Sequence, residues 1–401
     1  MKKRIAVLGA GVMGSCLAIN LARLGAHVTL IDRNRRPMAE ASRFNEGKIH
    51  LGYLYGADAT LQTARHILPG GLAFAPLMSE MIDQDVSAHA TSTDDLYLVD
   101  RDSLIGPDAL AGHFDAVSGL IRAHRDASRY LTDVSGATVS HLTSAELDGL
   151  ASDRITAGFR VPERSVETGW VADVLAEAVL ASPRVTFLPG VTVSGATPTD
   201  DGTSVTVKGA PEFHDRFDIV VNALWGGRVE IDLTAGLSPA RGWTHRVRWC
   251  LFIHTRSRVD VPSALIALGP FGDVKNYNGH DFYMSWYPAG LVAQGTGATL
   301  TPPPLPTGAG REQFIEAVRE GLGDAIPRIH EVVDAADSII VAGGHVFAEG
   351  RGTIGDPGSD LHRRDRFGAT RAGNYVSVDT GKYSTAPWMA RALAHQLVGS
   401  R

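Results

Sequence analysis

Residues 2–33 read KKRIAVLGAGVMGSCLAINLARLGAHVTLIDR and decide how the first part of the chain folds. Apolar residues at 5–8 and at 28–31 predict two short strands. Between them, leucines recur at helical spacing up to Gly25, where a helix is expected to end. The stretch therefore predicts a strand, a glycine-rich turn, a helix and a second strand.

The turn carries the fingerprint of a dinucleotide-binding βαβ unit. Gly9 permits the tight turn, Gly11 lets the backbone approach a pyrophosphate, and Gly14 lets the helix pack closely on the strands. The helix N-terminus offers N–H groups to phosphates, and Asp32 can accept a hydrogen bond from a ribose hydroxyl. The alternative is a structural unit of this kind that holds no ligand. The residues predicted to hold the dinucleotide are Gly9, Gly11, Val12, Met13, Gly14, Asp32 and Arg33.

Length and composition narrow the class of protein. A chain of 401 residues is too long for one compact core and predicts two domains. The hydrophobic content of 44% and the net charge of −6 are typical of a globular protein without a nucleic-acid-binding surface. Only two cysteines occur, so we expect a reducing compartment rather than a disulfide framework. No apolar run reaches membrane-spanning length, and the N-terminus enters a strand directly, so we expect a cytoplasmic protein.

The next part of the chain predicts an ordered loop and helices. Residues 43–56 show no steady period and read as an ordered loop. Residues 61–82 predict a helix in two pieces, split at the Pro-Gly pair that begins at Pro69. Apolar residues at three-to-four spacing predict a long amphipathic helix over 107–130. TSAE at 143–146 predicts a capping box.

The second half of the chain is richer in strands. A helix over 169–181 precedes three short predicted strands within 185–208, which form a meander. The apolar run at 218–227 favours a buried parallel strand. Consecutive strands within 241–295 favour an antiparallel sheet, and hence a second domain of different architecture. A strand, turn and helix at each end of the chain indicate that both ends share one domain.

Four segments together resemble a known family. They are the fingerprint at 9–32, KIHLGYLY at 48–55, VVNALWG at 220–226 and DTGKYSTAPWMARAL at 379–393. In this order they resemble the FAD-dependent oxidoreductases of the D-amino-acid oxidase, glycine oxidase and glycerol-3-phosphate dehydrogenase superfamily. The resemblance implies FAD as the cofactor, with its ADP half on the fingerprint.

The resemblance also implies a division into domains. We expect an α/β fold, α+β overall, in which a Rossmann-like FAD-binding domain is interleaved with a substrate domain built on an antiparallel sheet. The FAD-binding domain is predicted to comprise residues 1–82, 163–225 and 340–401. The substrate domain is predicted to comprise residues 83–162 and 226–339.

In that family, three further segments meet the cofactor. The segment matching 45–52 runs beside the flavin, the strand matching 220–226 approaches the dinucleotide, and the C-terminal turn resembles the GGKxTT turn of glycerol-3-phosphate dehydrogenases. That turn presents a helix N-terminus to the flavin ring. Asp379 and Thr380 stand where the family usually has small residues. The additional implied cofactor residues are Asn45, Lys48, Ile49, His50, Leu51, Ala223, Trp225, Gly226, Gly381, Lys382, Tyr383, Ser384 and Thr385.

His50 and Arg351 are two of the three residues to which the resemblance assigns catalysis or substrate binding. His50 could be a base, a hydrogen-bond donor or a covalent flavin anchor, or, like Lys48, an ordinary loop residue. Arg351 falls near a GxRP-like motif whose arginine grips the substrate's carboxylate or phosphate, a task that suits the forked guanidinium. The alternative for Arg351 is a solvated loop side chain.

Tyr283 is the third catalytic candidate. It lies in DFYMSWYP at 281–288, a strand that in relatives often lines the substrate side of the flavin. Arg241, Arg246 and Arg248, from the neighbouring predicted strand, are further candidates for substrate binding. The alternative for them is exposure to solvent, which is more common for arginines on strands. The 15 histidines show no metal-ligand spacing, so no metal site is predicted.

The resemblance implies an FAD-dependent oxidase or dehydrogenase that oxidises the C–N bond of a small amine or amino acid by hydride transfer to flavin. One alternative is an FAD-dependent dehydrogenase of a 2-hydroxy acid or a polyol phosphate, which would need a base such as His50, His280 or His345. Another is an NAD(P)-dependent dehydrogenase or a non-catalytic nucleotide-binding protein. Oxygen or another acceptor would reoxidise the flavin. The sequence leaves substrate, acceptor and oligomeric state open.

Overall fold

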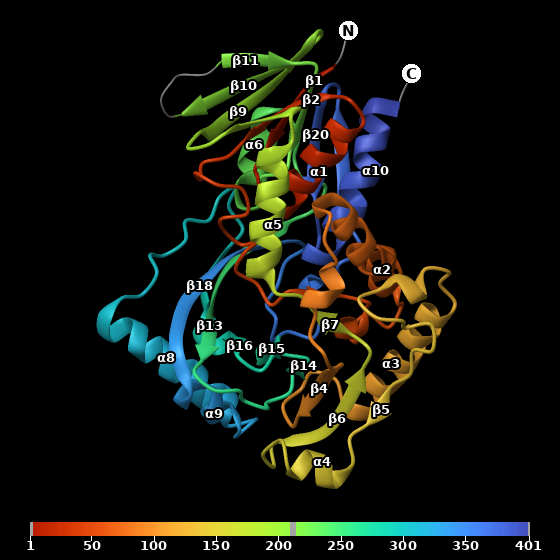
Figure 1. Cartoon of the computed structure of the whole chain (residues 1–401), viewed down its shortest axis with the longest axis vertical. Helices are drawn as coiled ribbons and strands as arrows, with labels where there is room; N and C mark the ends of the chain where they lie inside the picture. The colour runs from red at the N-terminus through yellow and green to blue at the C-terminus, as the bar shows by residue number, and fades with distance from the viewer. Residues whose placement is uncertain (1–2, 209–213, 400–401) are drawn as a thin grey trace.

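A computed structural model describes residues 3–208 and 214–399. Its first sheet has six strands in the order β19-β20-β12-β1-β2-β8, and all of its pairs are parallel except β19 with β20. Because both ends of the chain supply strands, this sheet joins segments far apart in sequence (Figure 1). The strand bounds are Arg4–Leu8 for β1, His27–Ile31 for β2, Val185–Leu188 for β8, Ile219–Asn222 for β12, Gly368–Ala372 for β19 and Tyr375–Asp379 for β20.

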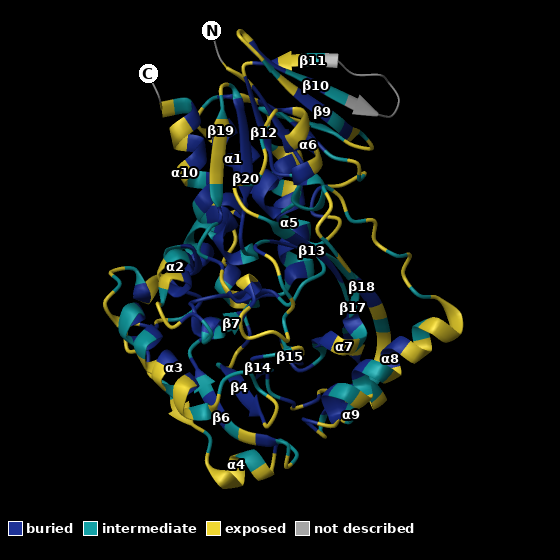
Figure 2. Ribbon diagram, turned by 180° about the vertical axis from the view of Figure 1, so that it is seen from behind, coloured by how far each residue is buried: buried dark blue, intermediate teal, exposed yellow. Residues whose placement is uncertain are grey.

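Helices pack beside this sheet and bury it. In α1 (Val12–Arg23) every residue up to Ala22 is buried, because the helix lies between the sheet and its neighbouring helices. The neighbours are α2 (Gln62–Ile82), α5 (Thr168–Ala181) and the C-terminal α10 (Ala386–Gly399). Figure 2 shows α1 and the central strands in the buried colour. The predicted strand–turn–helix–strand unit and the predicted buried parallel strand, β12, are therefore confirmed.

A small antiparallel sheet covers the other face of the six-stranded sheet. It consists of β9 (Thr192–Thr199), β10 (Gly202–Lys208) and β11 (His214–Phe217), with α6 (Arg228–Thr234) packed beside β9. The predicted three-strand meander within 185–208 is wrong in one member. Val185–Leu188 pairs with β2 and extends the parallel sheet, so β11 is the third strand of the meander.

The second large sheet occupies the lower part of the molecule (Figure 1). Its order is β17-β13-β16-β15-β14-β4-β6-β5, with β18 also paired to β13, and only β14 with β4 is parallel. The antiparallel sheet predicted from residues 241–295 is confirmed. The bounds are Asp95–Asp100 (β4), Ser140–His141 (β5), Ile155–Val161 (β6), Trp243–Thr255 (β13), Ala264–Ala267 (β14), Gly272–Asn276 (β15), Asp281–Trp286 (β16), Leu291–Gly295 (β17) and Ala336–Glu349 (β18).

Helices α8 (Gly308–Gly323) and α9 (Ile329–Asp334) pack on this sheet through a core that includes Phe314, Val318 and Leu322. The outer side of α8 is exposed in Figure 2. The remaining short elements are β3 (Lys48–Ile49), β7 (Arg164–Ser165), α3 (Pro107–Arg122), α4 (Ser144–Asp148), α7 (Tyr287–Gly290), and 3-10 turns at Tyr53–Tyr55, Val86–His89, Ala127–Arg129, Trp225–Gly227, Asp360–His362 and Tyr383–Thr385.

The prediction of a split helix over 61–82 is wrong, because α2 is continuous through Pro69 and Pro76. The glycines that follow Pro69 serve packing rather than a break. A Cβ on Gly70 would lie 2.8 Å from Thr385 Cγ2, and one on Gly71 would collide with the carbonyl oxygen of His50. The helix thus accepts the backbone of both predicted flavin segments against one face.

The prediction for 107–130 is wrong at its end, since α3 stops at Arg122. A turn follows, in which the N–H of His124 donates to the carbonyl of Ile121, and Ala127–Arg129 forms a separate 3-10 turn.

The predicted capping box is confirmed: the Thr143 side chain accepts from the N–H of Glu146, and the Glu146 side chain accepts from the N–H of Thr143.

The predicted division into domains stays a prediction. β18 runs through residue 340, where that prediction places a boundary, and pairs along its length with β13. Within residues 3–208 and 214–399, no helix is long and apolar enough to cross a membrane.

Candidate active site

The fingerprint turn has the shape that its glycines predict. Gly9 adopts φ +93°, and a Cβ there would lie 2.9 Å from the carbonyl oxygen of Ala223. A Cβ on Gly14 would collide with the carbonyl oxygen of Gly9, so the helix can pack this closely only without a side chain. Gly11 is the N-cap of α1 and, as a glycine, offers no side chain to cap the helix. The N–H of Val12 donates instead to Ser42 Oγ at 2.9 Å. The turn is therefore a close-packed backbone cradle.

Asp32 closes this cradle from the end of β2. Its Oδ2 accepts from the N–H of Ala10 at 2.7 Å, and its Oδ1 accepts from the N–H of Asn34 at 2.8 Å. Oδ1 also accepts from Asn34 Nδ2 at 2.9 Å, whereas Oδ2 has one donor among the described residues, so Oδ2 keeps the capacity to accept a further hydrogen bond. The ribose contact stays a prediction. The neighbouring Arg33 pairs with Glu40 at 2.6 Å on the surface.

The end of β12 approaches the same turn. Ala223 donates its N–H to the carbonyl of Leu8 at 2.8 Å, which sets its own carbonyl against Gly9. Trp225 Nε1 donates to the carbonyl of His345 at 2.7 Å, and Gly226 lies against the His345 ring. Thus Ala223, Trp225 and Gly226 connect the fingerprint to β18.

The loop at 45–51 is ordered by internal bonds. Asn45 accepts from the N–H of Gly47 at 2.9 Å through Oδ1 and donates through Nδ2 to the carbonyl of Ala41 at 3.0 Å. Ile49 and Leu51 are buried in the main core. The N–H of Leu51 donates to Glu163 Oε1 at 2.5 Å, so a buried carboxylate holds the backbone directly after His50.

Lys48 belongs to a buried network of charges. Its Nζ lies 2.6 Å from Asp95 Oδ2 and 3.5 Å from Glu163 Oε2, and Lys275 Nζ lies 2.8 Å from the same Asp95 oxygen. Tyr97 donates its hydroxyl to Glu163 at 2.6 Å. Two ammonium groups therefore face two carboxylates, and the network is balanced in charge. Burial opposes ionisation of Lys48, but the charges of Asp95 and Glu163 raise its pKa above the usual value.

His50 follows Lys48 and is only 2% exposed. Burial, followed by the charges of Lys382 and Lys48, lowers its pKa well below the usual value, so the imidazole is neutral at neutral pH. Its Nδ1 has no hydrogen-bond partner among the described residues, and its Nε2 lies 3.9 Å from Glu46 Oε1. A neutral imidazole can accept a hydrogen bond or a proton through its unprotonated nitrogen, although a lowered pKa makes it a weaker base.

The C-terminal turn is shaped by Asp379, one of the two residues that depart from the family pattern. Its Oδ1 accepts from the N–H of Gly381 at 2.9 Å, and its Oδ2 lies 3.4 Å from Arg228 NH2. Gly381 adopts φ +68°, which favours glycine. Thr385 donates its hydroxyl to the carbonyl of Thr380 at 2.6 Å and accepts from the N–H of Lys382. The turn is thus a closed structure at the start of α10.

A cavity of about 220 Å³ lies between the loop at 45–57, the nine-stranded sheet and this turn. Its walls include Leu268 and Phe271. The charged or titratable side chains that matter here are Glu46, His50, Arg246, Arg248, Arg364 and Lys382. Burial is the largest influence on Lys382 and, together with Arg364 and Arg246, outweighs the opposing charge of Glu46 and lowers the Lys382 pKa to about 8. The cavity therefore combines a neutral histidine with a cluster of cations.

Two of the predicted catalytic residues lie outside the lining of this cavity. Arg351 is exposed and lies against Gly242. Tyr283 is 2% exposed and packs with Cys250 and Phe252, with its ring centroid 5.5 Å from that of Phe252. Their catalytic roles stay predictions.

Sequence reasoning did not single out Arg364 or Glu46. Arg364 lies in the loop before β19, and its N–H donates to Thr63 Oγ1 at 3.1 Å. Glu46 sits between Asn45 and Lys48, two residues that the resemblance did identify. The HRRDRF segment at 362–367 does resemble an arginine-containing segment that the family carries just before this strand, but its arginines could not be ranked without the fold.

The predicted cofactor segments fit a dinucleotide. The close approach of Gly9 to Ala223 supplies a side-chain-free cradle. Buried polar atoms without a partner among the described residues occur in both segments expected beside the flavin, namely His50 Nδ1, Tyr383 OH and Ser384 Oγ. Since buried polar groups are normally satisfied, these atoms indicate that a bound molecule completes the site.

The fold and this site define a dinucleotide-dependent oxidoreductase. The chain belongs to the family described as DAO, FAD dependent oxidoreductase, whose model matches residues 4–395. Family membership decides between the cofactors considered above: this protein is an FAD-dependent enzyme. When bound, FAD supplies the hydride acceptor.

Solved structures share the fold over the whole chain. Glycine oxidase from Geobacillus kaustophilus is 16% identical with a TM-score of 0.70, covering 100% of this chain and 96% of that one. NikD, an amino acid oxidase essential for nikkomycin biosynthesis, is 14% identical with a TM-score of 0.70, covering 100% and 95%. L-α-glycerophosphate oxidase from Mycoplasma pneumoniae, solved with FAD bound, is 13% identical with a TM-score of 0.63, covering 100% and 96%. At such identities the likeness establishes the fold.

Proposed function

We propose that this enzyme oxidises the C–N bond of a small amino acid, transferring a hydride to FAD. The observation that carries the proposal is the group of cations around the cavity. Arg246, Arg364 and Lys382 meet there beside the two segments expected at the flavin. A guanidinium binds a carboxylate through two parallel hydrogen bonds, which would fix the position of the substrate's α-carbon.

The protein's own contribution is to position the substrate. Arg246 is 4% exposed and donates through NH1 to Tyr287 OH at 2.6 Å, so its guanidinium is already oriented. An amine in its neutral form needs no strong base for this reaction, and no carboxylate other than Glu46 and Asp273 lines the cavity among the described residues. Pre-orientation lowers the entropy lost on binding the carboxylate.

Anaerobic spectra of the FAD-loaded protein test the proposal. Amino acids should bleach the flavin at least about tenfold faster than the matching amines that lack the carboxylate, because a charge-assisted pair is lost. Arg246→Gln should remove most of this difference, whereas Arg256→Gln, at an exposed position beyond the end of β13, should leave it unchanged. A panel in which no amino acid and no amine bleaches the flavin would overturn the proposal.

A 2-hydroxy acid is the second candidate, and His50 is the observation that favours it. Oxidation of an alcohol requires a group that takes the hydroxyl proton, and the neutral imidazole of His50 in the cavity wall could take it. His50→Gln should then slow flavin reduction by a hydroxy acid by about 100-fold or more. If the same variant slows reduction by amino acids equally, His50 is not the alcohol-specific base.

A further inference from the structure

Four cationic side chains line the cavity without a carboxylate within ion-pair distance among the described residues. They are Arg246, Arg248, Arg364 and Lys382. Arg246 and Arg364 are 4% and 9% exposed, so water can compensate little of their charge. Buried cations of this kind are normally paired.

The two arginines of β13 are held by neutral partners. Arg246 NH1 donates to Tyr287 OH at 2.6 Å, and Arg248 NH2 donates to Ser285 Oγ at 2.7 Å. The Arg248 guanidinium also lies 4.6 Å from the centre of the Tyr287 ring. These contacts orient the guanidinium groups but leave buried N–H groups without an acceptor among the described residues: Nε of Arg246, Nε of Arg248 and NH1 of Arg364.

The acids in the cavity wall are too few to neutralise these cations. Lys48 and Lys275 are already balanced by Asp95 and Glu163. Two acids, Glu46 and Asp273, remain in the wall.

The surroundings of these two acids shift their pKa values in opposite directions. Burial opposes its ionisation, but the charge of Lys382 and then that of Arg248 lower the pKa of Glu46. Burial raises the pKa of Asp273, which accepts a hydrogen bond from Ser285 Oγ at 2.6 Å. Even if both acids are ionised, two of the four positive charges in the cavity wall have no balancing carboxylate among the described residues.

The spacing of the arginines gives these charges two separate positions. Arg246 and Arg248 are two residues apart on one strand and both reach the cavity. Alternate residues of a strand point to the same face and lie about 7 Å apart. Ser285 Oγ, which accepts from Arg248 NH2, donates to Asp273 Oδ1, whereas Arg246 NH1 donates to Tyr287 OH, so the two guanidinium groups are held by different partners. Burial is the first cause that lowers the pKa of Arg246, and among the neighbouring cations Arg364 comes before Arg248 in lowering it.

We propose that the substrate of this site carries two anionic groups on a short carbon chain, one bound by Arg246 with Arg364 and the other by Arg248. The proposal rests on the proposed function, since it names the class of substrate for the same cavity. The second group would be a carboxylate or a phosphate, because both present two oxygens to a guanidinium fork. A molecule with one anionic group would leave one arginine uncompensated.

Calorimetric titration of the FAD-loaded protein with unreactive acids tests this directly. Succinate and butyrate have the same chain length, and 3-phosphonopropionate replaces one carboxylate of succinate by a phosphonate on the same carbon chain. Succinate or 3-phosphonopropionate should bind at least about tenfold more tightly than butyrate, because an additional charge-assisted pair forms. Tighter binding of succinate would indicate a carboxylate as the second anionic group, and tighter binding of 3-phosphonopropionate would indicate a phosphate. Equal affinities for butyrate and for both of these acids would overturn the proposal.

The variant Arg248→Gln tests whether Arg248 binds the second anionic group of the substrate. The variant should bind succinate only as tightly as the wild type binds butyrate, while its affinity for butyrate stays unchanged. Arg256→Gln is the matched control on the same chain segment, because Arg256 is exposed and donates to the carbonyl of Asp334 rather than lining the cavity. A succinate preference that survives in Arg248→Gln would contradict the assignment. The wild-type ligand series needs no variant to fold.

The two proposals fail in different ways. If monoanionic and dianionic amino acids bleach the flavin equally fast and bind equally well, the dianion inference is overturned while amino-acid oxidation stands. If no amino acid or amine bleaches the flavin but succinate still binds more tightly than butyrate, amino-acid oxidation is overturned and the dianion site is supported.

Discussion

Replacing Asp95 by asparagine should destabilise the protein strongly, because Asp95 neutralises two buried ammonium groups. Its Oδ2 lies 2.6 Å from Lys48 Nζ and 2.8 Å from Lys275 Nζ, and Asp95, Lys48 and Lys275 are at most 3% exposed. An asparagine has a similar shape but no charge. Lys48 would then have only Glu163, at 3.5 Å, and Lys275 would have no ion-pair partner among the described residues.

The expected loss in the free energy of unfolding is about 3–5 kcal/mol, which is the usual cost of removing one partner from a buried ion pair. Urea denaturation at low ionic strength measures it, since urea does not screen charges as guanidinium does. Lys275→Met combined with Asp95→Asn should recover part of the loss, because it removes the orphaned charge together with its partner.

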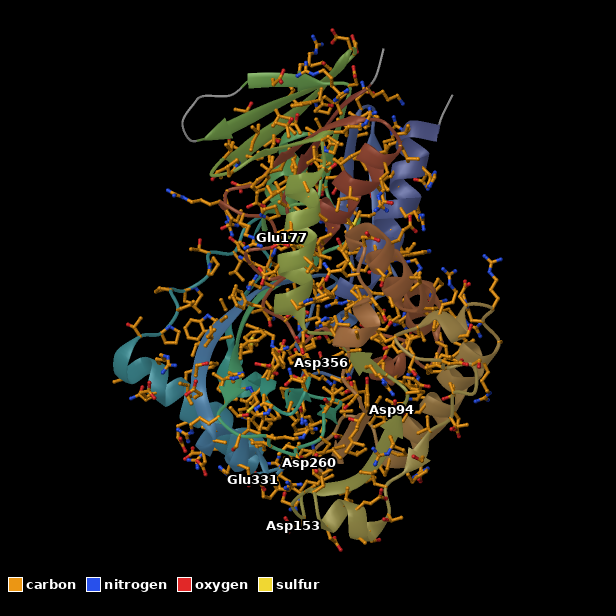
Figure 3. The ribbon with its side chains drawn as sticks, in the orientation of Figure 1. Asp94, Asp153, Glu177, Asp260, Glu331 and Asp356 are labelled. Atoms are coloured by element: carbon orange, nitrogen blue, oxygen red, sulfur yellow. The ribbon has the colours of Figure 1, made fainter. Side chains whose placement is uncertain are left out.

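Asp94→Asn is the matched control one residue away. Asp94, labelled in Figure 3, pairs with Arg164 at 3.3 Å, and both side chains are partly exposed. Such a pair contributes about 0–1 kcal/mol. If Asp95→Asn lowers the free energy of unfolding no more than Asp94→Asn does, the ion pairs of Asp95 with Lys48 and Lys275 do not stabilise the protein.

The network also predicts a pH dependence. Burial opposes ionisation of Asp95, but the charges of Lys275 and Lys48 lower its pKa. A carboxyl group whose folded pKa is lowered stabilises the protein above its unfolded pKa of about 3.9, and this contribution is lost as the pH falls through the folded pKa. The difference in the free energy of unfolding between wild type and Asp95→Asn should therefore be largest at neutral pH and should decrease only at acidic pH. A difference that decreases between pH 8 and pH 6 would contradict the lowered pKa of Asp95.

Three further predictions concern the cofactor turn, Lys382 and the thiols. Gly14→Ala should abolish FAD retention, because a Cβ there collides with the Gly9 carbonyl, whereas Gly112→Ala, where a Cβ meets nothing within 4 Å, should retain the flavin spectrum. The affinity for succinate should fall as the pH rises through about 8, because Lys382 then loses its positive charge. The variant Lys382→Arg should flatten the dependence of succinate affinity on pH, because arginine stays charged. An unchanged pH dependence in this variant would refute the role of Lys382. Cys16 and Cys250 are buried and burial raises the pKa of both thiols, so neither should react with a thiol reagent at neutral pH until the protein unfolds; rapid labelling of the native protein would count against the fold.

The parts of the fold that sequence predicts well are those governed by local physics. The fingerprint glycines are required by backbone clashes within one turn, and the capping box at Thr143 depends on residues three apart. The apolar run at 218–227 could be recognised as a parallel strand because β12 is covered on both faces. Such features need no knowledge of distant segments.

The errors arise where distant segments decide the local structure. Pro69 and Gly70 have the composition of a helix break, yet α2 continues because its glycines face the backbone near His50 and Thr385. Val185–Leu188 resembles a meander strand, yet it pairs with β2 across more than 150 residues of chain. These outcomes follow from tertiary packing, which overrides local propensity.

The candidate site was predictable in its outline but not in its charges. The strand pattern offered Arg241, Arg246 and Arg248 alike, and of these only Arg246 and Arg248 line the cavity. Glu46 and Arg364 acquire meaning only because the fold brings their segments together. Arg351 falls near a GxRP-like motif of the family, with glycine in place of the proline, and it lies exposed beside Gly242. Sequence spacing alone cannot rank arginines that come from different loops.

The most direct test of the account is a visible spectrum of the purified protein, recorded before and after anaerobic addition of a dianionic amino acid such as aspartate or glutamate. We expect a bound-flavin spectrum that is bleached by the amino acid and restored by an electron acceptor. A protein that retains no flavin, even after incubation with FAD, would contradict the central claim that these four segments enclose FAD.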